Sequence, residues 1–233
     1  GSLNKSLKNI SAENLGAAVI KDSIAKTKIE KKEVDEIILG QVLTGGTGQN
    51  PARQASIKSG LPVETPAHVV NQVCGSGLRS IVSGFQSISS NNSNIIIAGG
   101  QENMSLAPHA IHLRDGKKLG DAKLIDTMIQ DGLWDAFNEY HMGMTAENVA
   151  EKFQITRDEQ DHFALNSQEK ALEAQKHNKF EKEIINFKIK SKKSEIDFSK
   201  DEHPRDGISL DSLSRLKPVF KKDGTVNAGN ASG

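Results

Sequence analysis

Apolar and polar residues along the first sixty positions follow two different periods. After Ser11 the apolar positions recur at helical spacing, which predicts a helix with Ser11 as its N-cap. The stretch 34–42 (VDEIILGQV) is short and mostly apolar, which is typical of a buried strand. A second helix is expected over 51–59, because the proline that starts it and Gly60 behind it suit the two ends of a helix.

A strand, a helix and another strand are predicted over residues 67–98. The segment 67–73 (AHVVNQV) is rich in β-branched residues, and in 94–98 (NIIIA) every residue after Asn94 is apolar. Between Cys74 and Ser90 the period changes from two to 3.6, which predicts a helix. The apolar side chains of that helix fall on one face: Leu78, Ile81, Val82, Phe85 and Ile88. This order indicates a βαβ unit, so we predict an α/β fold with helices covering a mostly parallel sheet.

The pattern becomes irregular from Met104 onward. Two helices are expected further along, one from about Thr145 and one after the capping box that begins at Thr156. The segment 183–190 predicts a strand, and 190–201 predicts a solvated, charged loop. Long irregular connections in compact domains are usually lids or binding loops.

These patterns divide the chain into three parts. We expect an α/β core over 1–103, a long α+β insertion over 104–225, and a return to the core that starts over 226–233.

Composition narrows the function classes. The 233 residues carry 30 basic and 30 acidic side chains, so the basic excess typical of nucleic-acid binding is missing. A single cysteine excludes an internal disulfide framework and a cysteine-rich zinc site. No apolar run approaches the roughly 20 residues that span a bilayer, and the first residues lack a secretory pattern. We expect a cytoplasmic globular protein with no metal site and no membrane or nucleic-acid partner.

The lone cysteine, Cys74, stands where the predicted strand meets the predicted helix. The positive end of a helix stabilises a thiolate, and the thiolate is the nucleophilic form of cysteine. The small residues 75–77 (GSG) leave room for an acyl group to approach. A free cysteine is more often a small buried hydrophobe, but the strand–Cys–Gly–Ser–Gly–helix context favours a nucleophile.

The segment 71–77 (NQVCGSG) resembles the nucleophile motif of the thiolases. Four further segments are similar to thiolase segments, in the same order: 40–55 (GQVLTGGTGQNPARQA), 95–109 (IIIAGGQENMSLAPH), 140–150 (YHMGMTAENVA) and 224–233 (GTVNAGNASG). The resemblance covers essentially the whole chain, and YHMGMTAEN is more similar to the biosynthetic, acetoacetyl-CoA-forming subgroup. It implies a thiolase-like layered α/β/α core with a mostly parallel sheet and a long α+β loop-domain insertion.

The resemblance also implies a reaction and a set of contacts. Cys74 would accept an acetyl group from acetyl-CoA, and the carbanion of a second acetyl-CoA would then attack it to give acetoacetyl-CoA and CoA; the reverse is thiolysis. Coenzyme A is therefore substrate and product, with no separate cofactor, and a homodimer or homotetramer is implied. Residues matching positions that contact CoA are Leu133, His141, Met142, Arg205, Ser212, Ala228 and Ser232. On the residues alone, a surface histidine, a packing methionine and a solvated arginine are the commoner interpretations.

Three thiolase motifs do not occur in this sequence: the Gly-His-Pro histidine, the second, Cys-x-Gly cysteine and Asn-Glu-Ala-Phe. All belong to the family's second half, so we expect an N-terminal portion that lacks the C-terminal domain and the first strand, with negligible turnover by itself. Two alternatives stay open: a ketoacyl synthase of the same superfamily, and a non-catalytic CoA-binding module. A cysteine hydrolase is disfavoured because no histidine has a recognisable partner setting.

Overall fold

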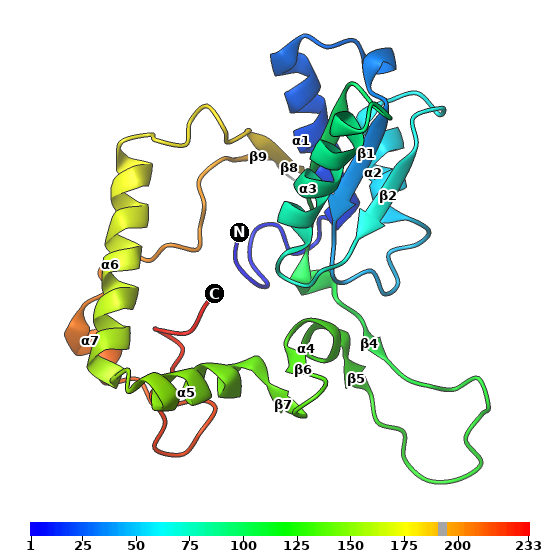
Figure 1. The fold of residues 1–233 in the computed structure, drawn as a ribbon. Helices are drawn as coiled ribbons and strands as arrows, with labels where there is room; N and C mark the ends of the chain where they lie inside the picture. Colours follow the sequence, from blue (N-terminus) through cyan, green and yellow to red (C-terminus); the bar gives the residue numbers. More distant parts are fainter. Residues whose placement is uncertain (191–194) are drawn as a thin grey trace. The chain divides into compact units, whose positions relative to one another are not determined.

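The computed structural model describes residues 1–190 and 195–233 (Figure 1). The chain divides into two compact units. The first unit comprises residues 3–132, and the second comprises residues 1–2 and 133–233. The three-part division expected from the sequence stays a prediction.

A three-stranded parallel sheet forms the centre of the first unit. Its strands are β1 (Glu36–Gly40), β2 (Ala67–Val70) and β3 (Ile96–Gly100), in the order β2-β1-β3. Every pairing is parallel, and Gly40 of β1 stands beside Gly100 of β3. The prediction of an α/β fold with a parallel sheet is confirmed.

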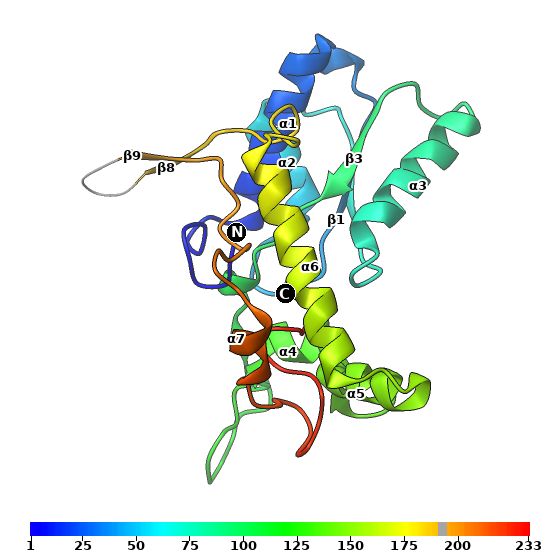
Figure 2. The same ribbon diagram turned by 90° about the vertical axis from the view of Figure 1, so that its left-hand side faces the viewer.

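Helices cover both faces of this sheet, as Figure 2 shows. On one face α1 (Ala12–Thr27) packs against α2 (Pro51–Ser59), and on the other α3 (Ser76–Ser89) packs against β1 and β3. Apolar side chains from α1, β1, α2 and their connections make the core between them: Ile20, Ile24, Val34, Ile37, Leu39, Ala52, Ala55 and Leu61. The helix predicted over 51–59 is confirmed, and Gly60 ends it in the left-handed conformation, with φ of 83°.

The apolar face of α3 does not pack against the sheet, contrary to what its pattern suggests. Its five apolar side chains are exposed, Phe85 by 71%. The residues of α3 that are buried are the small ones: Ser76, Ser80 and Gly84. A Cβ on Gly84 would lie 3.3 Å from Ile96 of β3, so a small residue lets helix and strand approach closely.

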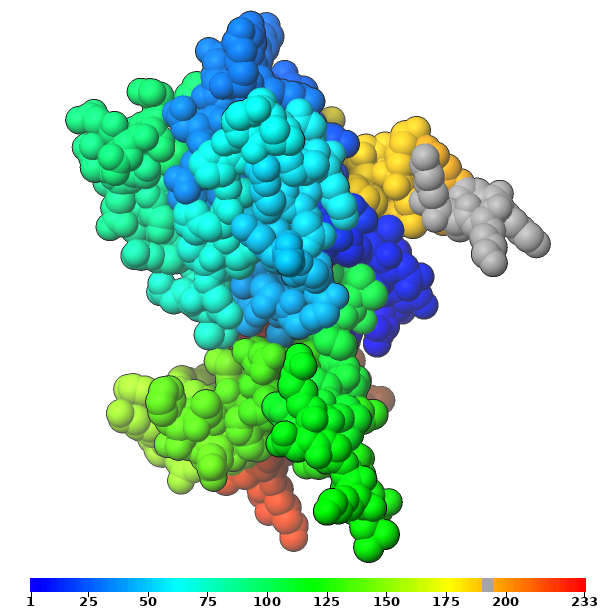
Figure 3. All heavy atoms as spheres, turned by 90° about the vertical axis from the view of Figure 1, so that its right-hand side faces the viewer, coloured from blue at the N-terminus to red at the C-terminus, as the bar shows by residue number. Residues whose placement is uncertain are grey.

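The remainder of the first unit consists of short elements. They are η1 (Lys31–Glu33), η2 (Met104–Leu106), β4 (His109–Ala110), β5 (Ile125–Asp126) and α4 (Thr127–Gly132). Strands β4 and β5 pair antiparallel, and the residues between them form a projecting arm, seen in green in Figure 3. Leu119 in this arm is 92% exposed.

The described part of the second unit consists of helices, two antiparallel strand pairs and one isolated antiparallel bridge. Its elements are β6 (Trp134–Asp135), β7 (Tyr140–His141), α5 (Met142–Phe153), α6 (Arg157–Lys176), β8 (Phe187–Lys190), β9 (Glu195–Phe198) and α7 (Leu210–Ser214). The capping box at Thr156 is confirmed, because Thr156 and Glu159 each accept a backbone N–H of the other.

Two sequence predictions in this unit need correction. Helix α5 begins at Met142 rather than near Thr145, because the ring of His141 accepts a hydrogen bond from the N–H of Gly143 and caps the helix. The stretch 190–201 is not simply a loop, since β9 lies in it and pairs with β8; residues 191–194 of the predicted loop lie outside the described residues. Within the described residues, none of the helices is both long and apolar enough to cross a membrane.

Candidate active site

Cys74 lies on the turn that joins β2 to α3 in the first unit. Its side chain is exposed, and it carries the thiol of the chain's one cysteine. Gly75 is the N-cap of α3, so Cys74 is the residue just before the cap. Aligned peptide dipoles place about half a positive charge at the start of a helix, which stabilises a nearby anion such as a thiolate. The place of Cys74 between strand and helix agrees with the sequence pattern, and its role stays a prediction.

The turn that carries Cys74 is held by hydrogen bonds to its own backbone. The hydroxyl of Ser76 accepts the N–H of Gln72 at 2.9 Å and donates to the carbonyl of Val73 at 2.6 Å. The side-chain oxygen of Asn71 accepts the N–H of Val73 at 2.9 Å. Val73 itself has φ of 47°, in the left-handed region that β-branched residues rarely adopt. Strand β2 therefore stops at Val70, three residues before the end predicted from its β-branched composition.

Glycines at the ends of β1 and β3 bring this turn close to the sheet. A Cβ on Gly40 would lie only 2.4 Å from the carbonyl carbon of Ser76 and 2.6 Å from the nitrogen of Gly77. A Cβ on Gly100 would lie 3.5 Å from the Cα of Gly77. The first turn of α3 therefore rests on the backbone of β1, and Cys74 stands beyond the carboxyl ends of parallel strands, where ligands bind in open α/β sheets.

Three of the residues predicted to contact CoA lie together in the second unit. Leu133, His141 and Met142 belong to the β6–β7 hairpin and the start of α5, and the carbonyl of Leu133 accepts the N–H of Met142 at 2.8 Å. The ring of His141 is stacked on Phe220, with ring centroids 4.8 Å apart and planes inclined by 20°. Phe220 is the residue that sequence reasoning missed here. In the sequence, Phe220 is marked only as an aromatic residue within a lysine-rich segment. That mark does not indicate that its stacking partner lies 79 positions earlier.

Hydrogen bonds and charges hold this group in place. Within the hairpin, the side chain of Asn138 and the backbone N–H groups of Asn138 and Phe137 hydrogen-bond the Asp135 carboxylate and lower its pKa. Beside Phe220, the ammonium of Lys221 donates to Glu151 of α5 at 2.8 Å. That hydrogen bond and the attraction between the charges raise the pKa of Lys221 and lower the pKa of Glu151.

Arg205 and Ser212 are both exposed, and each is tied locally. The backbone N–H of Arg205 donates to the side-chain oxygen of Gln168 on α6 at 2.9 Å. Ser212 forms a reciprocal capping box with Ser209 at the start of α7, and its hydroxyl also donates to the Ser209 carbonyl at 2.7 Å. The hydroxyl of Ser212 therefore stabilises a helix start, a role that the sequence did not suggest.

Ala228 and Ser232 are exposed, and they follow a segment that buried carboxylates hold. Glu147 of α5 is 3% exposed, and its carboxylate accepts the N–H groups of residues 225 and 226 and the hydroxyl of Thr225, at 2.8–3.0 Å. Asp161 of α6 accepts the amide of Asn230 at 2.8 Å and the guanidinium of Arg157. These carboxylates fix the backbone that leads to Ala228 and Ser232.

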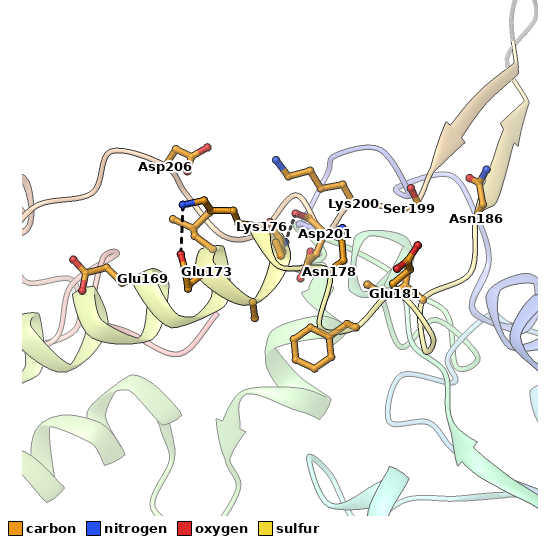
Figure 4. A pocket seen from close by; sticks show the side chains of 15 residues that line it. Glu169, Glu173, Lys176, Asn178, Glu181, Asn186, Ser199, Lys200, Asp201 and Asp206 are labelled. Atoms are coloured by element: carbon orange, nitrogen blue, oxygen red, sulfur yellow. Dashed lines mark hydrogen bonds and ion pairs between the residues drawn. The ribbon is translucent and has the colours of Figure 1, made fainter.

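The second unit also has a hollow of about 970 Å³ at the carboxyl end of α6 (Figure 4). None of the residues predicted to contact CoA lines it. Its described lining has five carboxylates and two ammonium groups: Glu169, Glu173, Glu181, Asp201 and Asp206 with Lys176 and Lys200. An acidic excess repels the phosphates of CoA, so size alone does not make this hollow a nucleotide site.

Comparisons with known proteins decide the family. The thiolase N-terminal domain family matches residues 1–233. This chain belongs to the thiolase family. It is 56% identical to the protein named "Acetyl-CoA acetyltransferase" of Rhizobium meliloti and 54% identical to the protein of that name from Shinella zoogloeoides, in each case over all of this chain and 59% of the relative. The crystal structure of the Bacillus anthracis acetyl-CoA acetyltransferase matches with a TM-score of 0.97 at 38% identity, over all of this chain and 59% of that one.

These matches confirm two predictions made from the sequence. The chain has the thiolase α/β fold, and it corresponds to the N-terminal portion of the family's proteins. The thiolase chain spans about 59% of the length of the relatives it matches.

Proposed function

We propose that this chain is the nucleophile-bearing part of an acetyl-CoA C-acetyltransferase, which joins two acetyl-CoA molecules into acetoacetyl-CoA and CoA. One observation carries the proposal: Cys74 is exposed before the first turn of α3, in the NQVCGSG segment of a thiolase-family chain. The names of the relatives support this choice of substrate.

The proposed reaction has two stages. The Cys74 Sγ attacks the carbonyl carbon of acetyl-CoA, the bond from that carbon to the CoA sulfur breaks, and CoA leaves as a thiolate that takes up a proton. A second acetyl-CoA then loses a proton from its methyl carbon to a base of the complete protein, which balances the proton taken up by CoA. The resulting carbanion attacks the acetyl group, the bond to Sγ breaks, and acetoacetyl-CoA leaves. The helix start behind Cys74 stabilises the anionic sulfur at both stages.

We propose that the second unit holds the CoA arm. The residues assigned to this contact are Leu133, His141, Met142, Arg205, Ser212, Ala228 and Ser232. The stacked rings of His141 and Phe220 offer a flat surface for the pantetheine chain, and the exposed Arg205 carries the charge that phosphate requires. Coenzyme A is substrate and product in this proposal, and the complete protein is a cytoplasmic homo-oligomer that needs no other cofactor.

The test is to trap the acyl-enzyme. The complete protein that carries this chain is mixed with acetyl-CoA labelled in the acetyl group, quenched in acid, digested, and mapped by mass spectrometry. We expect the label on Cys74 and its loss in Cys74→Ser, which keeps size and fold. Label on another residue, or an equally labelled Cys74→Ser protein, would contradict the proposal. Acylation from a carrier-protein thioester but not from acetyl-CoA would point to a ketoacyl synthase instead.

A further inference from the structure

The backbone before Cys74 is strained. Val73 adopts φ of 47°, and a β-branched side chain in this region clashes with its own backbone. The side chain is 45% exposed, so core packing does not compensate for the strain. Such residues persist only when their surroundings hold them, and they cluster at functional sites.

Ser76 is the side chain placed to hold this conformation. Its hydroxyl bridges the N–H of Gln72 and the carbonyl of Val73, at 2.9 and 2.6 Å, and so spans the two residues that precede Cys74. Ser76 is 4% exposed, which limits the access of water to its hydroxyl. Its backbone rests against Gly40 of β1, so the bridge is anchored to the sheet.

We propose that Ser76 is a positioning residue for Cys74, because its buried hydroxyl holds the strained turn at Val73 and so keeps the thiol at the start of α3. The inference rests on the proposed function for the role of Cys74. Among the described residues, the Ser76 hydroxyl bonds only within the turn, so it acts through the backbone of that turn. Without it the turn relaxes, and the sulfur leaves the position where the helix start stabilises its anion.

The test compares two buried serines of α3. Ser76→Ala removes the bridge, and Ser80→Ala is the matched control. Ser80 is also buried, and its single hydroxyl proton is shared between the carbonyls of Gly77 and Gly99, each 2.7 Å from Oγ, but it does not touch the turn. We expect both variants to lower stability, so stability alone does not separate positioning from packing. The readout is the rate at which iodoacetamide alkylates the single cysteine of the chain, measured at constant pH in native buffer.

We expect the alkylation rate of Ser76→Ala at constant pH to fall about two- to fivefold, the size of a typical helix-terminus effect. The rate of Ser80→Ala should equal that of the unaltered chain. Asn71→Ala removes the acceptor of the Val73 N–H at an exposed position and should slow alkylation as well, which covers the case that Ser76→Ala does not fold. Unchanged rates in Asn71→Ala and in any folded Ser76→Ala protein would overturn the inference.

A second measurement separates this inference from the proposed function. In the complete protein, Ser76→Ala should slow acetyl transfer to Cys74 with little change in KM, because the residue does not reach the substrate. If Cys74 is not the acyl carrier, no label reaches it even in the unaltered protein, whereas the alkylation rates still report whether Ser76 positions the thiol.

Discussion

Replacing Gly40 by alanine tests the contact that carries the candidate nucleophile. The added Cβ would lie 2.4 Å from the carbonyl carbon of Ser76, where ordinary contacts begin at 3.4 Å, so β1 and α3 must separate by roughly 1 Å. The atoms in the way are backbone, which a rotamer change cannot move. The separation also pulls the Ser80 hydroxyl away from the carbonyl of Gly99, a bond of 2.7 Å.

The expected cost follows from these two effects. Overpacking a tight contact typically costs about 1–3 kcal/mol, and one lost hydrogen bond adds about 1 kcal/mol. We therefore expect Gly40→Ala to lower the free energy of unfolding by about 2–4 kcal/mol. The matched control is Gly77→Ala on the other side of the contact. Its Cβ would meet no described atom within 4 Å, and alanine favours a helix by up to about 1 kcal/mol over glycine, so this variant should be as stable or more stable.

Urea unfolding followed by circular dichroism measures both variants. Hydrogen exchange then locates the change, and we expect lost protection in residues 36–40 and 76–89 of Gly40→Ala only. Because the start of α3 moves, alkylation of Cys74 should change as well. A Gly40→Ala protein as stable as the unaltered chain would refute the close contact, and equal losses in both variants would show that the cost is not steric.

Two further predictions concern carboxylates. Glu147→Ala deprives the N–H groups of 225–226 of their acceptor, so we expect the free energy of unfolding in urea to fall by about 3 kcal/mol and proteolysis near the C-terminus to become faster. The control is Glu151→Ala, which removes an exposed ion pair on the same helix and should change stability by under about 1 kcal/mol. Equal effects of the two substitutions would contradict the buried role of Glu147. The backbone N–H groups of residues 95 and 94 lower the pKa of Asp35 in the folded chain. The stability that Asp35 contributes is therefore present above its unfolded pKa near 4 and is lost as pH falls through its lower folded pKa. In urea titrations the stability gap between the unaltered chain and Asp35→Asn should therefore narrow as pH falls from about 5 to about 2, and a constant gap would refute this assignment.

Elements with strong local signals were predictable from the sequence. Pro51 and Gly60 bound α2 because each restricts or frees the backbone at its own position. The capping box at Thr156 depends on residues three apart, and the structure has it as predicted. The family resemblance likewise rested on contiguous segments, such as NQVCGSG.

The buried side of α3 and the stacking of His141 on Phe220 were not predicted, because both depend on contacts with residues elsewhere in the chain. The apolar pattern of α3 predicted the helix but not its buried side. The sheet instead receives the small residues Ser76, Ser80 and Gly84, whose i, i+4 spacing was present in the sequence and was not recognised. The stacking of His141 on Phe220 joins positions far apart in the chain, and no local period encodes it.

Contacts with the sheet, rather than the turn itself, fix the position of the candidate nucleophile Cys74. A turn of small and polar residues is ordinarily mobile, because it buries little apolar surface. Here the parallel register places Gly40 beside Gly100. Neither residue has a side chain, so the first turn of α3 packs closely against the backbone of both strands. Ser76 then transfers that placement to the residues before Cys74 through two hydrogen bonds. The small residues of α3 pack against the sheet, so the apolar face of the helix is left exposed. The same small residues hold the exposed thiol of Cys74 in one place. A nucleophile that attacks a bound thioester requires such a fixed position.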